Sequence, residues 1–351
     1  MRKFNQTVLV ILILFGILSC VEEGQQIPLG EFEKGVLVIN EGAFGVNDGE
    51  IYHYDPITGL IKSNIFEGKN RRPFAGLIQD MVEAEGRLYL VANTGKVEVV
   101  DPRDFLSKGA VVEGLDISRS IVTTNQKLFI ADWGPYDANF NSPNSYVAVV
   151  DDLDGGGITK KIPVSSRPEK MFVSGNQIFV ATTAGKKLEV ISLDSETITS
   201  FQDLEGSPGG FFELLGTLIL YAYDAEMVYF HQIDKTTGNI QGVLPVGLKW
   251  ATSNFTLSED GEMLIITSTG WPDYNDAIAR VSIVNRQVLN EAIFTGSGFY
   301  GIGYHPGLKE IYVGDNNGFQ GNGTVIVLDQ NGQQKKSFAV GRGPSGFLVK
   351  E

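Results

Sequence analysis

The chain has 351 residues, of which 42% are hydrophobic and 42 are glycine, a composition typical of a strand-rich globular protein with many turns. Its 28 basic and 42 acidic residues give a formal net charge of −14, which argues against nucleic acid or an anionic membrane surface as a ligand. There is one cysteine, Cys20, so neither a disulfide nor cysteine catalysis is expected in the folded part.

Residues 1–19 are predicted to be a lipoprotein signal peptide. Arg2 and Lys3 precede an apolar run at 8–18 that is too short for a permanent membrane helix. The run ends in Ile-Leu-Ser-Cys, which is similar to a bacterial lipobox, so Cys20 is predicted to carry the lipid. A plain secretory peptide with a chance cysteine is the alternative.

Residues 20–35 are predicted to form a lipidated tether, and the membrane would be contacted only through the lipid on Cys20. Glu22 and Glu23 resemble an acidic signal that directs lipoproteins outward. The expected location is therefore the cell envelope, as a surface-exposed outer-membrane lipoprotein.

A repeated pattern organises the rest of the chain. Residues 88–102, LYLVANTGKVEVVDP, contain two β-branched runs around a short polar break, and related copies begin at residues 36, 128, 178, 218, 263 and 311. Repeats of strands and turns at this spacing are typical of a β-propeller. The prediction is an all-β, seven-bladed β-propeller over residues 36–351, closed by a C-terminal strand at 345–350 that joins blade 1.

The connections between the second and third strands differ in length. Taken in chain order, blades 1, 3, 6 and 7 are predicted to carry long loops, while blades 2, 4 and 5 keep short ones. In blade 1 the third and fourth strands are expected at 50–55 and 60–66. Each long loop holds aromatic residues among Gly, Asn, Asp and Pro, and the links between blades add basic residues on the same face. Together these indicate a recognition surface for a small polar ligand.

The predicted ligand-binding residues fall in two chemical groups. Stacking is assigned to the aromatic residues and hydrogen bonding or charge pairing to the arginines. The full set is Arg72, Arg119, Trp133, Tyr136, Arg167, Trp250, Trp271, Tyr274, Tyr300 and Phe319.

An enzymatic alternative places a divalent metal ion between Asp80, Glu169 and Asn254 near the central channel, as in a propeller hydrolase or lactonase. The three histidines are spread over the chain without a nearby nucleophile, so a Ser-His-Asp triad is not supported. No catalytic residue, cofactor or resident metal is therefore predicted.

The motifs VLVINEG at 36–42, RPEKMFVSGNQIFVA at 167–181 and GRGPSGF at 341–347 resemble YncE-like (YVTN-type) seven-bladed propeller lipoproteins. That resemblance implies the same fold and an envelope location. One branch of the family captures cobalamin for a TonB-dependent outer-membrane transporter, which implies a corrinoid ligand and such a transporter as partner. A non-enzymatic ligand-capture protein is the favoured interpretation; the hydrolase and a protein-binding scaffold stay open.

Overall fold

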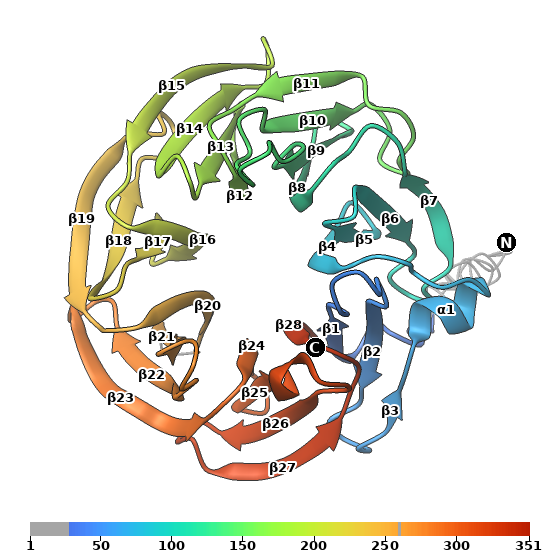
Figure 1. Ribbon diagram of the computed structural model, residues 1–351, viewed down its shortest axis with the longest axis vertical. Helices are drawn as coiled ribbons and strands as arrows, with labels where there is room; N and C mark the ends of the chain where they lie inside the picture. Colours follow the sequence, from blue (N-terminus) through green and yellow to red (C-terminus); the bar gives the residue numbers. More distant parts are fainter. Residues whose placement is uncertain (1–27, 259–260) are drawn as a thin grey trace, which may run out of the picture.

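The computed structural model describes residues 28–258 and 261–351. The predicted signal peptide and Cys20 lie outside them. Seven four-stranded antiparallel sheets form a ring around a central axis, as Figure 1 shows. We call the region around this axis, inside the innermost strands, the channel. The protein is an all-β, seven-bladed propeller, as the repeat predicts. No helix within the described ranges is long and apolar enough to cross a membrane.

The first four blades, from the channel outwards, have the following strands. Blade 1 contains β28 (Pro344–Lys350), β1 (Gly35–Asn40), β2 (Glu50–Tyr54) and β3 (Ile61–Lys62); blade 2 contains β4 (Ile78–Ala84), β5 (Arg87–Ala92), β6 (Lys96–Val100) and β7 (Ser107–Val111); blade 3 contains β8 (Ser118–Thr124), β9 (Lys127–Asp132), β10 (Tyr146–Val150) and β11 (Lys160–Pro163); blade 4 contains β12 (Pro168–Ser174), β13 (Gln177–Thr182), β14 (Lys187–Ser192) and β15 (Thr197–Asp203).

Three blades and two short helices complete the described chain. Blade 5 contains β16 (Ser207–Leu214), β17 (Thr217–Tyr223), β18 (Met227–Ile233) and β19 (Ile240–Gly247); blade 6 contains β20 (Ala251–Leu257), β21 (Glu262–Ser268), β22 (Asp276–Ser282) and β23 (Gln287–Gly296); blade 7 contains β24 (Phe299–His305), β25 (Glu310–Asp315), β26 (Thr324–Asp329) and β27 (Gln334–Ala339); the helices are α1 (Ile65–Asn70) and η1 (Asn317–Phe319).

The second strand of each blade is nearly all apolar because neighbouring blades cover both of its faces. In β5, for example, the five residues from Leu88 to Ala92 are all buried. A strand buried on both faces appears in the sequence as a continuous apolar run rather than an alternating one. This packing explains why the repeat can be recognised in the amino-acid sequence.

The ring closes as predicted. Strand β28 pairs antiparallel with β1, with Val38 opposite Phe347 and Val36 opposite Val349. The two ends of the folded chain thus share blade 1, which Figure 1 shows beside the C-terminus. Strand β28 covers the inner edge of β1, which would otherwise be open to pairing with another chain, and it supplies the fourth strand of blade 1.

The outer part of blade 1 differs from the expectation. The strand predicted at 60–66 is only β3, and α1 follows it on the outer wall (Figure 1). The buried carboxylate of Glu50 accepts hydrogen bonds from the backbone N–H groups of Phe66 (3.0 Å) and Glu67 (3.2 Å). A carboxylate at these positions satisfies N–H groups that have no partner within the helix, which favours a helix here.

Residues 28–34, assigned from sequence to the tether, pack against blades 1 and 2. Phe32 is 1% exposed and lies edge-on to Phe105 and His53. Its N–H donates to the carbonyl of Arg103 at 3.2 Å. The packed part of the protein therefore begins before the first strand.

Candidate functional site

The loops between second and third strands share one face of the propeller with the links between blades; we call it the loop face. The loops of blades 1, 3, 6 and 7 are longer than the others, as predicted. Large aromatic side chains on these four loops are strongly exposed, including Phe44 (95%), Trp271 (82%) and Phe140 (74%). Several such residues on one face indicate a recognition surface.

Arg119, Trp133 and Glu169 meet at the channel end of blades 3 and 4. The Arg119 guanidinium donates from Nη2 to Glu169 Oε1 (2.8 Å) and stacks 4.4 Å from the Trp133 ring. The Trp133 indole N–H also donates to Glu169 at 3.2 Å. Both charged side chains are less than one-fifth exposed, so each ion depends on the other for its charge partner.

The pKa of Arg119 reflects two opposing effects. Burial disfavours the guanidinium charge, but the carboxylate of Glu169 outweighs that effect and keeps the pKa above its ordinary value. Glu41 and Tyr300 also act electrostatically on Arg119, although they come from blades 1 and 7. The charge on Arg119 is therefore influenced by residues of blades 1 and 7 as well as by its partner from blade 4.

A second guanidinium approaches the same indole. Arg167, in the link before β12, lies 4.9 Å from the Trp133 ring and 6.0 Å from that of Tyr136. Its Nη2 donates to the carbonyl of Phe140 at 2.8 Å, and the Tyr136 and Phe140 rings meet edge to face. We call Arg119, Trp133, Tyr136, Arg167 and Glu169 the blade-3 cluster.

The backbone of the blade-3 loop is held by two side chains. Buried Asp132 accepts from the N–H groups of Ile117 (2.9 Å) and Gly134 (2.8 Å), among others. Ser145 donates to the carbonyl of Trp133 (2.8 Å) and accepts from the N–H of Arg167 (3.0 Å). These bonds fix the positions from which the indole and the second guanidinium project.

Tyr300 and Phe319 form a second group at the channel. Their rings meet edge to face at 5.0 Å, and the Tyr300 hydroxyl donates to Glu41, which also accepts from Gln79. Burial and then the Glu41 charge raise the pKa of Tyr300, so the hydroxyl remains a donor at neutral pH. Phe319 remains 43% exposed on the loop face.

Trp250 lies apart from both groups. It is 48% exposed at a shallow recess of about 340 Å³ over blades 4 to 6, whose lining also includes Lys186 and Tyr223. Trp271 and Tyr274 are exposed on the blade-6 loop (82% and 48%). The structure thus spreads the predicted aromatic residues over several parts of the loop face.

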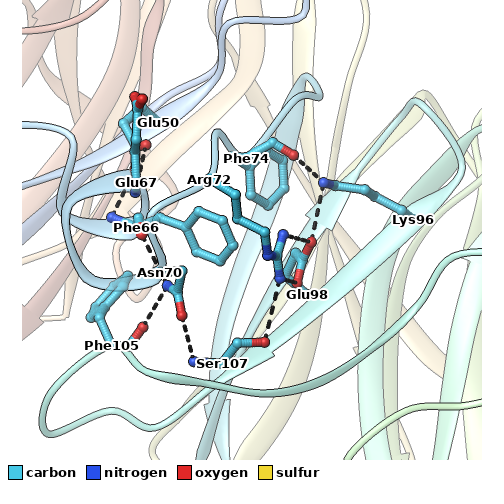
Figure 2. A network of polar contacts seen from close by, with 10 residues as sticks. All are labelled: Glu50, Phe66, Glu67, Asn70, Arg72, Phe74, Lys96, Glu98, Phe105 and Ser107. Carbon is cyan, nitrogen blue, oxygen red and sulfur yellow. Dashed lines mark hydrogen bonds and ion pairs between the residues drawn. The ribbon is translucent and has the colours of Figure 1, made fainter.

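Arg72 does not lie at the mouth of the channel. The prediction placed it there because it belongs to a link between two blades. Figure 2 shows its guanidinium in a two-pronged pair with Glu98, with Nη1–Oε1 at 2.7 Å and Nη2–Oε2 at 2.8 Å. The guanidinium also packs on the ring of Phe66 in α1. Glu98 is 2% exposed, so Arg72 neutralises a buried carboxylate among the outer strands.

The three residues of the metal alternative have separate partners. Asp80 pairs with Lys170 at 3.4 Å, Glu169 pairs with Arg119, and Asn254 donates to the carbonyl of Tyr300 at 2.7 Å. Within residues 28–258 and 261–351, no group of three or more His, Cys, Asp or Glu side chains is arranged to hold a metal ion.

Sequence reasoning did not single out Glu41, Asp132 or Ser145. Glu41 follows the first apolar run, in the VLVINEG motif. Its position directly after this run was the one signal in the sequence. Asp132 and Ser145 border the blade-3 insertion, and only the fold shows that they fasten it.

Fold and site together define a seven-bladed β-propeller with an aromatic and cationic loop face. The family model DUF5074, a domain of unknown function, matches residues 34–343, and the chain belongs to that family. No curated protein matches it.

Solved propellers resemble the chain in fold alone. A putative 6-phosphogluconolactonase from Bacteroides fragilis matches with a TM-score of 0.65 and 11% identity, over 93% of this chain and 100% of that one. A quinonprotein alcohol dehydrogenase-like protein from Bacteroides thetaiotaomicron matches with a TM-score of 0.64 and 11% identity, over 91% and 79%. BamB from Moraxella catarrhalis gives 0.52 and 13%, over 93% and 89%. The names of these neighbours indicate different functions, so the fold does not select one.

Proposed function

We propose that this protein is a non-enzymatic lipoprotein of the cell envelope that captures a polar small molecule on its loop face and passes it to an outer-membrane transporter. The most specific form of the proposal is a corrinoid ligand and a TonB-dependent transporter. Lipidation at Cys20 would hold the propeller at the cell surface.

One observation carries the proposal. Four of the ten predicted ligand residues, Arg119, Trp133, Tyr136 and Arg167, come together in the blade-3 cluster although they come from three separate segments. Stacked rings and guanidinium donors suit a flat ligand fringed with amide groups and carrying a phosphate. The exposed rings on neighbouring loops would extend the contact area.

The acidic side chains near the channel support a binding role over a metal-dependent one. Glu169 and Asp80 are each paired with a cation from the same ring of inner strands. A carboxylate already paired in this way is a poorer metal ligand, because the metal must displace its partner.

The first test is an absorbance titration of the purified chain with cyanocobalamin. The proposal expects a saturable spectral change. An unchanged spectrum with the protein in more than 10-fold excess over cyanocobalamin, at about 10 μM or higher, would exclude a corrinoid as the ligand. A detergent pull-down of the tagged lipoprotein from its own membranes tests the partner. Recovery of an outer-membrane transporter is expected. If no transporter is recovered from wild-type cells, either with or without crosslinking, the delivery role is wrong.

A further inference from the structure

We propose that Arg167 binds an anionic group of the captured ligand, such as a phosphodiester or a carboxylate. The placement of the ligand at the blade-3 cluster rests on the proposed function. The choice of Arg167 over the other arginines rests on its own contacts.

Most other arginines of the described chain have a carboxylate partner. Ion pairs join Arg72 to Glu98, Arg87 to Asp154, Arg103 to Glu33, Arg119 to Glu169, Arg280 to Glu262 and Arg342 to Asp48. Arg167 takes part in no ion pair within the described residues, although it belongs to a cluster with one carboxylate. Arg119 and Arg167 contribute +2 and Glu169 contributes −1, so the cluster carries a charge of +1 on a chain of −14.

The guanidinium of Arg167 also has unused hydrogen-bonding capacity. Of its N–H donors, one on Nη2 meets the carbonyl of Phe140, and the buried Nε has no acceptor within hydrogen-bond distance. A buried donor without a partner destabilises the folded chain. An anion that binds the guanidinium once its side chain has left the Phe140 carbonyl would supply both the missing acceptor and the missing charge.

The surroundings define the rest of the ligand group. The guanidinium carbon of Arg167 lies 4.9 Å from the Trp133 ring. The N–H bonds of a guanidinium lie in its plane, so an acceptor must approach there. The Tyr136 ring lies 6.0 Å from the guanidinium carbon and meets the Phe140 ring edge to face; the two residues are 46% and 74% exposed. The group that binds here therefore combines an anion with an adjoining flat or apolar part.

The backbone of Arg167 is fixed before any ligand arrives. Its N–H donates to Ser145 (3.0 Å) and its carbonyl accepts from Thr183 (2.9 Å). Only the side chain has to leave the Phe140 carbonyl when an anion binds. This limits the conformational entropy lost on binding.

The test uses inorganic phosphate and the fluorescence of Trp133. The chain has three tryptophans, so a Trp250→Phe, Trp271→Phe background leaves Trp133 as the single reporter. Phosphate is titrated at constant ionic strength, with sodium chloride as the balancing salt. We expect a saturable change whose apparent affinity for phosphate falls at least tenfold in Arg167→Gln. The control Arg286→Gln removes another arginine that has no carboxylate partner among the described residues, and it should leave this affinity unchanged.

Two results overturn the assignment. One is a phosphate response that is absent from the background protein, and the other is a response of equal affinity in Arg167→Gln. Circular dichroism of each variant confirms that the propeller is folded. If cyanocobalamin binds wild type and Arg167→Gln equally, the role of Arg167 is wrong while ligand capture stands, so the two proposals fail separately.

Discussion

Replacing Asp132 with alanine tests whether a buried carboxylate holds the blade-3 loop. Asp132 is 0% exposed and accepts hydrogen bonds from the N–H groups of Asp116 (3.0 Å), Ile117 (2.9 Å) and Gly134 (2.8 Å) and from the Ser118 hydroxyl (2.9 Å). Alanine leaves three backbone donors without an acceptor. An orphaned buried donor costs about 1–3 kcal/mol.

Gly134 is buried, whereas Asp116 and Ile117 are half-buried and can recover hydrogen bonds to water. We therefore expect Asp132→Ala to lower the free energy of unfolding by about 3–4 kcal/mol. Urea unfolding followed by circular dichroism measures this. The matched control is Asp137→Ala in the same loop, where an exposed carboxylate accepts from the N–H groups of Asn139 and Asn141, and a much smaller loss than in Asp132→Ala is expected.

The reasoning fails if Asp132→Ala loses less than about 1 kcal/mol, because a carboxylate with four partners would then contribute no more than a single exposed hydrogen bond. Equal losses in Asp132→Ala and Asp137→Ala would also contradict it. Because Asp132 directly precedes Trp133, the same variant should weaken cyanocobalamin binding, while Asp137→Ala should not.

Three further changes have separate physical causes. Arg72→Ala leaves buried Glu98 with Lys96 as its remaining cation. It should lower the free energy of unfolding in urea by about 1–2 kcal/mol without changing ligand affinity. A loss of binding would show that Arg72 belongs to the ligand site. Phe32→Ala removes a ring that is 1% exposed and should cost about 3 kcal/mol, and an unchanged urea midpoint would show that the segment does not belong to the fold. Burial lowers the pKa of His231 below 6.5, so its contribution to stability is complete above that pH and is lost as the pH falls through the folded-state pKa. His231→Gln should therefore show a smaller drop in melting temperature between pH 7 and pH 5, and an equal drop would exclude His231 as a cause.

The His231 prediction follows from its hydrogen bonds. The N–H of Glu205 points to Nε2 at 3.1 Å, so Nε2 must be the unprotonated nitrogen, and Nδ1 donates to the carbonyl of Leu220 at 3.3 Å. A second proton on Nε2 would face that N–H directly. Protonation therefore favours the unfolded chain.

The fold was predictable because propeller packing leaves a local mark. Second strands such as β5 and β9 are buried on both faces, and each copy therefore carries a continuous apolar run. The C-terminal strand was predictable for a related reason: blade 1 lacked an inner strand, and only β28 could complete it. The first inference uses patterns within a few neighbouring residues, and the second uses the number of strands that a closed ring of seven blades requires.

The site was predictable only in part because its pairings join distant residues. Arg72 has a carboxylate partner 26 positions away in Glu98. No local pattern distinguishes it from Arg167, which pairs with no carboxylate in the part of the chain that the structure describes. Helix α1 was missed for a similar reason, since Glu50 satisfies its first N–H groups from another strand. Sequence spacing indicated which residues share the loop face but not which of them are already paired.

The most direct test of ligand capture at the blade-3 cluster is isothermal titration of cyanocobalamin into wild type, Trp133→Ala, Arg119→Ala and Arg72→Ala. We expect Trp133→Ala to bind at least tenfold more weakly, Arg119→Ala to weaken binding as well, and Arg72→Ala to match wild type. Wild-type affinity in both Trp133→Ala and Arg119→Ala would contradict the account, because the ligand would then bind elsewhere on the propeller.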